Sequence, residues 1–575
     1  MEKETRSSPI GGGGLSGGGP SASEGFPSPR ELIVIAKPEA GLRATKEGVS
    51  SAVGADVSAL SKLLTSEGIT LQPLFGPSEE RLRQEAATLA PTTDVAVPDL
   101  SVYYRVEAPD EQLDELAKRL QGLEEVEAAY VQPPVEPAQV TVDDVEVLND
   151  MLPLAAEAPP ATPDFTSRQT YLDAALGGID ARYAWTLPGG GGAGIGIVDI
   201  EGGWNFTHED LKQNQGGVVG GTSSTNPGWR NHGTAVVGEF GGDRNSFGIT
   251  GICPDAHVRA VSIFGLGTAP AIRKAADVSK KGDIILIELH APGPEATGYG
   301  QQGYIAMEWW PQNYDAIRYA VAKGVIVVEA AGNGAVNYDA AIYNQRPAGF
   351  PTSWKNPFNP ANPSSGAVIV GAGAPPPGTH GRNHGPDRSR LGFSNYGARV
   401  DCQGWGREVT SAGYGNLQGG SNEDLHYTDT FSGTSSASPI VVGALGCVQG
   451  VLRAQGGTLL ASARAISLLR STGSPQQDAP GRPRTQRIGN RPNLRQLIPA
   501  ATGGWQYNKR VIRTHAKSGS QMIWAIIEGS HWLRVRPMSP DGLTNIFEIL
   551  CEALANNRRV DVYIQNGQIT QATLR

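Results

Sequence analysis

The chain has 575 residues, of which 39% are hydrophobic, so a globally disordered protein is excluded and several domains are expected. Acidic residues outnumber basic ones by 57 to 48, and this net charge of −9, without a basic stripe, does not indicate nucleic acid as a partner. No apolar run approaches the ~18–20 residues of a membrane-spanning helix, so a membrane is not an expected partner either.

The first 29 residues are rich in glycine and contain no apolar stretch of the kind that a secretory signal peptide needs. They predict a disordered tail. The four cysteines (Cys253, Cys402, Cys447 and Cys551) show no metal-ligand spacing, and most lie in apolar or motif segments, which is typical of buried free thiols. The sequence therefore predicts a cytoplasmic protein, with leaderless export as the alternative.

Residues 30–135 predict a small α+β domain. Its apolar patterns come in the order strand 30–38, helix 55–64, strand 69–75, strand 100–108, helix 110–123 and strand 126–134. The order β-α-β-β-α-β is that of a ferredoxin-like unit. The residues that follow, 136–164, are rich in Pro, Ala and acids and predict a linker that is well suited to proteolytic processing.

Residues 165–500 predict an α/β domain with three segments that carry chemistry. The apolar run that starts at Ile195 ends at Asp199 and indicates a buried parallel strand. His232 precedes a helix of small and apolar residues, and Ser435 lies at a helix N-terminus, where the dipole favours developing negative charge. A serine hydroxyl needs an imidazole to accept its proton, and the imidazole needs a carboxylate to orient it. Asp199, His232 and Ser435 are therefore the predicted catalytic set.

These segments resemble those of the subtilisin-like serine peptidases (subtilases) over roughly residues 166–490. The resemblance is also carried by HEDL at 208–211, GICPDAHV at 251–258, VIVVEAAGNGA at 325–335 and FSNYGARVDCQGWG at 393–406. It implies a subtilisin-like α/β fold, a parallel sheet with helices on both faces, and it implies that Asn333 donates to the oxyanion. It further implies that 30–135 is an inhibitory prodomain whose end, 131–134, approaches the catalytic site; a plain binding or spacer domain is the alternative. Calcium is common in the family, but no ligand string here assigns a site, so no cofactor is predicted.

Two acidic residues depart from the family pattern. Glu288 stands in the segment that resembles the cleft-lining strand, and Glu329 interrupts an apolar run just before Asn333. A buried carboxylate is costly unless it is paired, so one interpretation is that each is paired or half exposed. The other is that they line the substrate pocket together with Leu289 and Gly332, where they would favour a cationic side chain or shift the pH optimum.

Residues 505–575 predict a small β-rich domain, a barrel with one helix. Strand patterns at 521–529 and 531–539 precede a helix pattern from Asn545 and a hairpin with its turn at Asn566-Gly567. Aromatic residues in this segment suit either a binding module or core packing.

The sequence thus predicts a serine endopeptidase that acts on protein or peptide substrates and has its own N-terminal domain as inhibitor. Two alternatives stay open. One is a specialised peptide-maturation protease or transpeptidase, and the other is a catalytically silent binding scaffold.

Overall fold

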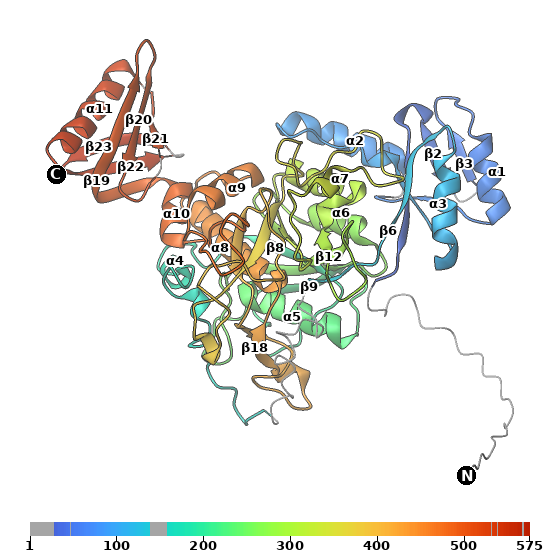
Figure 1. Ribbon diagram of the computed structural model, residues 1–575, viewed down its shortest axis with the longest axis horizontal. Coiled ribbons are helices and arrows are strands. Elements are labelled where there is room, and N and C mark those ends of the chain that lie inside the picture. The colour runs from blue at the N-terminus through green and yellow to red at the C-terminus, as the bar shows by residue number, and fades with distance from the viewer. Residues whose placement is uncertain are drawn as a thin grey trace.

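The computed structural model describes residues 28–575 apart from 46–47, 77, 139–157, 531, 538 and 566–567. An N-terminal α+β domain, a central α/β domain and a C-terminal barrel follow one another along the chain (Figure 1). The predicted glycine-rich tail, most of the predicted linker and the predicted Asn566-Gly567 turn lie outside the described residues.

The N-terminal domain is a four-stranded sheet in the order β4-β5-β1-β6, with every neighbouring pair antiparallel. Its strands are β1 Glu31–Ala36, β4 Leu71–Pro73, β5 Tyr103–Val106 and β6 Val126–Gln132, and its helices are α1 Ser58–Glu67, α2 Glu79–Leu89 and α3 Leu113–Gln121. A hairpin of β2 Leu42–Thr45 and β3 Gly48–Ser51 is added after β1. The leucines predicted on one face of α3 are buried against the sheet, whereas α2 has no counterpart among the predicted elements.

The central domain is built on a seven-stranded sheet in the order β16-β15-β14-β11-β8-β10-β9, and all neighbouring pairs are parallel. The strands are β8 Gly196–Glu201, β9 Gln215–Gly220, β10 His257–Ser262, β11 Ile284–Ile287, β14 Ile326–Ala330, β15 Val368–Gly373 and β16 Cys402–Trp405. Because both faces are covered by helices, the central strands are mostly apolar rather than alternating, and Asp199, Glu201 and Glu329 are buried exceptions. The predicted fold class, a parallel sheet with additional domains on either side, is confirmed.

Each face of the sheet packs against its own set of helices. On one face lie α5 Pro227–Gly241, α8 Thr434–Ala454, α9 Ser462–Ser471 and α10 Leu494–Thr502, with the short α4 Ala181–Ala184 beside them. On the other lie α6 Thr268–Val278 and α7 Pro311–Ala322. Figure 1 shows α6 and α7 on the side of the N-terminal domain and α8 and α10 toward the barrel. A two-stranded ribbon, β17 Val409–Ala412 and β18 Tyr427–Phe431, leads into α8.

Helix α8 is the most deeply buried helix of the central domain. By length and composition it could cross a membrane, contrary to the expectation from sequence, but its residues 434–452 are all buried inside the protein. Three of the four cysteines are buried and Cys551 is partly exposed, and all four are free thiols.

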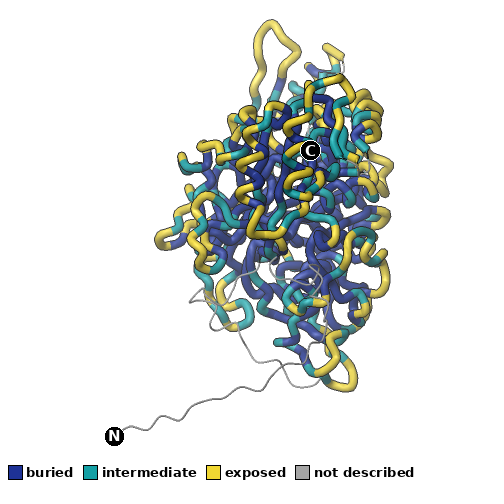
Figure 2. Tube along the Cα trace, turned by 90° about the vertical axis from the view of Figure 1, so that its right-hand side faces the viewer, coloured by how far each residue is buried: buried dark blue, intermediate teal, exposed yellow. Residues whose placement is uncertain are grey.

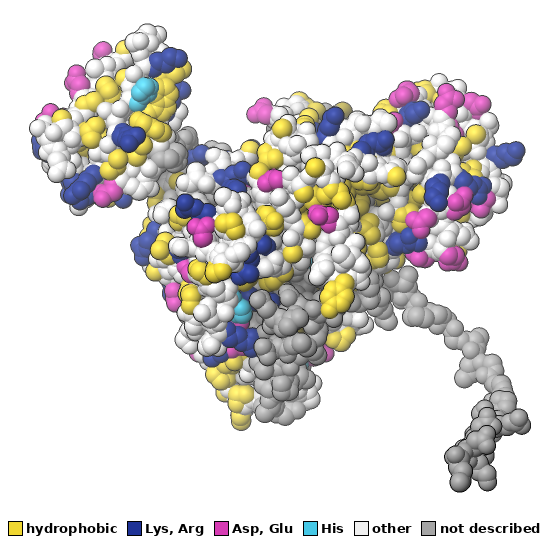
Figure 3. Space-filling view, in the orientation of Figure 1, with side chains coloured by type: hydrophobic (Ala, Val, Ile, Leu, Met, Phe, Trp, Pro, Cys, Tyr) yellow, Lys and Arg dark blue, Asp and Glu magenta, His cyan; other side chains and the backbone are white. Residues whose placement is uncertain are grey.

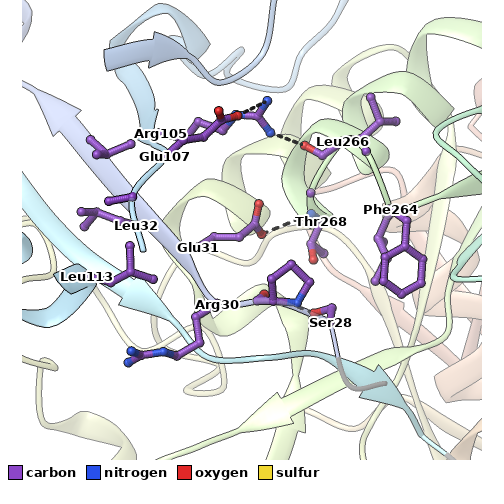
Figure 4. Close-up of a pocket in the computed structure, with 16 residues that line it drawn as sticks. Ser28, Arg30, Glu31, Leu32, Arg105, Glu107, Leu113, Phe264, Leu266 and Thr268 are labelled. Carbon is purple, nitrogen blue, oxygen red and sulfur yellow. Dashed lines mark hydrogen bonds and ion pairs between the residues drawn. The ribbon is translucent and has the colours of Figure 1, made fainter. Parts of the chain in front are cut away.

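The N-terminal sheet packs directly on α6 and α7, and the two domains share one hydrophobic cluster. At the N-terminus of α6, the Thr268 N–H donates to the Glu31 carboxylate at 3.4 Å, and Arg105 donates to the Leu266 carbonyl oxygen at 3.0 Å (Figure 4). Burial raises the pKa of Glu31.

In the tube view, buried backbone runs through the centre of the molecule and exposed segments lie at its rim (Figure 2).

The C-terminal unit is a closed barrel in the order β19-β20-β21-β23-β22, with one helix packed on it. Its elements are β19 Gly504–Lys517, β20 Met522–Ile527, β21 Trp532–Val535, α11 Pro540–Ala555, β22 Arg559–Gln565 and β23 Gln568–Leu574. The 14-residue strand β19 has no counterpart among the predicted elements because most of its side chains are polar and exposed.

On the face seen in Figure 3, acidic and basic side chains are interspersed over the N-terminal domain without a continuous basic band.

Candidate active site

The central strand β8 carries two carboxylates at its C-terminal end. Asp199 and Glu201 are both fully buried and, because they are two residues apart in a strand, they lie on the same face of the sheet. The apolar run of the sequence stops at Val198, but the strand continues to Glu201. The edge of the sheet therefore presents a pair of acids rather than one.

His232 is bonded to Glu201, not to Asp199. It lies on α5, is fully buried, and its Nδ1 lies 2.7 Å from Glu201 Oε2. The prediction that Asp199 orients His232 is therefore wrong in this structure. The physical reason is that Glu201 is the last residue of the strand and has the longer side chain, so its carboxylate reaches the His232 ring. Asp199 lies two residues earlier in the strand and has the shorter side chain.

Asp199 instead accepts a hydrogen bond from the Trp204 indole Nε1 at 2.7 Å. Burial raises the pKa of Asp199 well above its ordinary value, and the neighbouring charge of Glu201 raises it further. Burial also raises the pKa of Glu201 well above its ordinary value, and the hydrogen bond with Asp199 offsets only part of that rise. The interaction between the two acids raises the pKa of Asp199 and lowers that of Glu201, so Asp199 is the acid of the pair that keeps a proton more readily.

Ser435 is the second residue of α8, which begins at Thr434. Its Oγ and the Nε2 of His232 are both buried, and neither has a hydrogen-bond partner among the described residues. The His232 ring packs edge-on against Phe431 in the strand that leads to Ser435. Burial lowers the pKa of His232 to about 3, so its imidazole is neutral at pH 7 and can accept a proton.

Asn333 lies in the loop after β14, and its side chain is held in a fixed orientation. Its Oδ1 accepts hydrogen bonds from the backbone N–H and the hydroxyl of Thr434, each at 2.9 Å. The Nδ2 group is therefore directed away from Thr434 and into the cleft. The backbone N–H of Asn333 donates to Nδ1 of His290 at 3.3 Å, and burial, reinforced by His232, lowers the pKa of His290 to about 3.

The cleft is occupied by the end of the N-terminal domain. Residues Glu136–Pro137 form β7, which pairs antiparallel with β12 Leu289–Pro292, and β12 in turn pairs with β13 Tyr304–Ala306. The carbonyl oxygen of the next residue, Ala138, accepts hydrogen bonds from Asn333 Nδ2 at 2.7 Å and from the Ser435 N–H at 3.3 Å. The predicted contact segment, 131–134, belongs to β6 and the turn after it, so the chain reaches the site a few residues later than expected.

The two acids predicted to line a pocket point into the interior instead. Glu288 is fully buried and accepts a hydrogen bond from the Ser438 hydroxyl on α8. Glu329 is fully buried and accepts from the Glu308 N–H at 3.1 Å, next to the Arg399 guanidinium that pairs with Glu308. Burial raises the pKa of both acids. Residues 135–138, which occupy the cleft, are called the cleft-bound tail, or simply the tail, from here on. Among the described residues, neither acid forms a hydrogen bond with this tail, so the prediction of a cation-binding pocket is wrong.

The other two predicted substrate-binding residues do border the tail. Leu289 is paired with Pro137 in the β12–β7 register. Gly332 has φ +92°, and a Cβ there would lie 2.8 Å from the Asn395 amide, so only glycine fits. Its N–H donates to the Thr434 hydroxyl at 3.2 Å, which places it beside Asn333.

Sequence reasoning missed three residues of the site. Glu201 could have been found from strand periodicity, since it shares a face with Asp199. Gln301 and Tyr304, which contact Glu136, had no local signal because they come from a turn and a short strand that acquire their role only when the tail is bound. Within the described residues, no group of three or more His, Cys, Asp or Glu side chains is placed to hold a metal ion.

Residues 165–472 match the family model described as the subtilase family. Subtilisin DY of Bacillus licheniformis is 27% identical over 258 residues, which is 44% of this chain and 74% of that protein. Thermitase of Thermoactinomyces vulgaris is 29% identical over 309 residues, 52% of this chain and 86% of that protein. The solved structure of fervidolysin from Fervidobacterium pennivorans aligns with 16% identity and a TM-score of 0.46, covering 84% of this chain and 63% of that one.

Proposed function

This chain belongs to the subtilase family and is a subtilisin-like serine endopeptidase, as its motifs predicted, and we propose that Glu201, His232 and Ser435 are its catalytic groups. We propose further that the N-terminal domain holds the enzyme closed and that the enzyme cuts its own chain after Ala138. The observation that carries both parts is the Ala138 carbonyl oxygen, which accepts hydrogen bonds from Asn333 Nδ2 and from the Ser435 N–H.

In the first step Ser435 Oγ attacks the carbonyl carbon of Ala138 while its proton passes to His232 Nε2. The negative charge that develops on the carbonyl oxygen is stabilised by the two donors, Asn333 Nδ2 and the Ser435 N–H, which already point at that atom. Both donors belong to rigid surroundings, the loop braced by Thr434 and the first turn of α8. They therefore need little reorganisation when the charge appears.

The imidazolium formed on His232 is stabilised by the ionised Glu201 at Nδ1. His232 then gives its proton to the amide nitrogen of residue 139, the peptide bond breaks, and Ala138 remains as an ester on Ser435. Water attacks this ester, with His232 taking one proton from the water and returning it to Ser435 Oγ. The products are a chain that ends in the Ala138 carboxyl group and a chain that begins at residue 139.

Autoinhibition is supported by how the tail is held. The tail occupies the cleft as an added strand beside β12, the arrangement in which extended peptides bind sheet edges. The domain behind it is fixed to α7 by polar contacts: Tyr103 donates to Asp315 at 2.6 Å, and Gln132 Oε1 accepts from Gln312 at 2.6 Å and from Asn313 at 2.9 Å. A substrate must displace this strand before it can reach Ser435.

Intact mass spectrometry of purified protein tests the proposal. Wild type is expected to yield two fragments, one ending at Ala138, and to form an adduct with a fluorophosphonate serine probe. Ser435→Ala is expected to stay a single chain without adduct. Ser436→Ala is the matched control, because among the residues that the structure describes that hydroxyl bonds only to the backbone carbonyls of Trp405 and Gly433, so cleavage should persist. A wild type that neither cuts itself nor reacts with the probe would instead support a catalytically silent scaffold, and a cut at another position would refute the assignment of Ala138.

A further inference from the structure

The tail carries an acid that two side chains of the cleft hold directly. Tyr304 donates its hydroxyl to Oε1 of Glu136 at 3.0 Å, and Gln301 donates its Nε2 group to Oε2 at 3.2 Å. Glu136 lies two residues before Ala138 on β7, in register with His290. We propose that Gln301 and Tyr304 form a subsite that selects an acidic side chain, glutamate above all, at the third position before the cleaved bond. This inference rests on the proposed function, because it takes the tail as a guide to the peptides that the enzyme cuts.

The orientation of Gln301 makes this subsite a donor rather than an acceptor. Gln301 is 6% exposed, and its Oε1 accepts from Asn333 Nδ2 at 3.2 Å. Its Nε2 group also donates to the Pro137 carbonyl oxygen at 3.0 Å, so only N–H groups face the tail. The amide cannot rotate to offer its oxygen without losing these contacts with Asn333 and Pro137.

Tyr304 completes the pair from the other side. Its ring is half-buried against the His290 ring, with centroids 4.9 Å apart, so the hydroxyl is fixed near the tail. Burial and the charge of Glu136 raise the pKa of Tyr304, so the phenol keeps its proton and remains a donor. Two donors thus converge from different elements on the two oxygens of one carboxylate.

This arrangement predicts an order of preference among side chains at the third position before the cleaved bond. A glutamate offers an acceptor oxygen to each donor, and such bonds to a charged group are the stronger kind. A glutamine offers one oxygen to Gln301 and an NH₂ group to which the Tyr304 hydroxyl can only accept, so two neutral hydrogen bonds replace the two bonds to a charged carboxylate. A lysine offers donors only, so the Gln301 Nε2 group would lose its acceptor, and the Tyr304 hydroxyl could bond to the ammonium only by turning round to accept. An aspartate is one methylene shorter and reaches the pair less well.

Synthetic peptides test the subsite. The peptide that repeats residues 135–140 and its variants with Gln or Lys in place of Glu136 are each given to the purified, self-processed protein, and kcat/KM is measured. We expect the Glu peptide to be cut about tenfold better than the Gln peptide, and the Lys peptide least. Tyr304→Phe removes only the hydroxyl and should reduce the preference for Glu over Gln to about twofold. Gln302→Ala, an exposed neighbour of Gln301, should leave the preference unchanged.

Equal kcat/KM for the Glu, Gln and Lys peptides would overturn the subsite while leaving the peptidase intact, and so would an unchanged preference in Tyr304→Phe. If the protein cuts itself but no added peptide, the self-cleavage rates of Glu136→Gln and Glu136→Lys relative to wild type decide the same question. Absence of both self-cleavage and peptide hydrolysis would refute the proposed function instead, so the two failures are distinguishable.

Discussion

Replacing each acid of strand β8 in turn shows which of the two, Asp199 or Glu201, is the catalytic partner of His232. In Glu201→Gln the side chain keeps its shape and loses its charge, so the imidazolium of the transition state loses the carboxylate that lies 2.7 Å from Nδ1. In Asp199→Asn the amide oxygen can still accept from Trp204, and the new NH₂ group can still donate to Glu201. The first change removes a charge that the reaction needs, whereas the second retains both hydrogen bonds.

The expected size of the effect follows from the separation of the charges. Charge centres about 4 Å apart interact by about 4 kcal/mol at an effective dielectric constant of about 20. At 1.36 kcal/mol for each factor of ten in rate, Glu201→Gln should lose about a thousandfold in kcat. Asp199→Asn should stay within about tenfold of wild type, because it changes the neighbour of the charged group and not the charge itself.

The assay is peptide hydrolysis with the sequence of residues 135–140, together with the half-time of self-cleavage in newly made protein. Thermal unfolding of each variant controls for loss of folding, since both positions are fully buried. A thousandfold loss in Asp199→Asn with near-normal activity in Glu201→Gln would refute the structural assignment and restore the one predicted from sequence.

Three further outcomes are expected. Asn333→Ala should lower kcat by about 10²–10³ with little change in KM, measured on the same peptide, because one oxyanion donor is lost; an unchanged kcat would exclude that role. Gly332→Ala should lower the free energy of unfolding by about 1–3 kcal/mol in a chemical melt, since φ is +92°, and a neutral result would contradict the strain. Burial opposes ionisation of Glu408, but hydrogen bonds from His380 and His384 hold its pKa at about 2. That carboxylate therefore stabilises the fold above pH 4.5 by about 3 kcal/mol, and the contribution is lost as the pH falls toward 2. The melting temperature of Glu408→Gln should accordingly lie below that of wild type at pH 7 and approach it in acid, whereas a constant difference would argue against the shift.

The local signals in the sequence were sufficient for the central sheet and for most of the site. The apolar run before Asp199, the small residues after His232 and the glycine before Thr434 each reflect a requirement within a few residues, and the structure places these segments at one edge of the sheet. The choice between Asp199 and Glu201 depended on where a strand ends. A pattern of apolar residues cannot locate that end when the last residue is itself a buried acid.

The remaining errors concern contacts between distant parts of the chain. Glu288 is accommodated by Ser438, 150 residues away, so its surroundings could not be read from its neighbours. Residues Glu136–Pro137 have the composition of a linker, and they become a strand only because they pair with β12. The same reason hides the roles of Gln301 and Tyr304, because the hydrogen bonds that they donate to Glu136 exist only when that strand is present.

The N-terminal domain and helices α6 and α7 share one hydrophobic cluster, which helps to hold strand β7 in the cleft. How far occupancy of the cleft depends on protein concentration is determined by whether the chain is intact. While the bond after Ala138 is intact, strand β7 is tethered to the cleft of its own chain, and its local concentration is set by the length of chain that joins them. If that bond is cut, as we propose, the same contacts hold two separate molecules. Occupancy of the cleft then follows mass action, so the identical interface becomes sensitive to total protein concentration and to competing peptides.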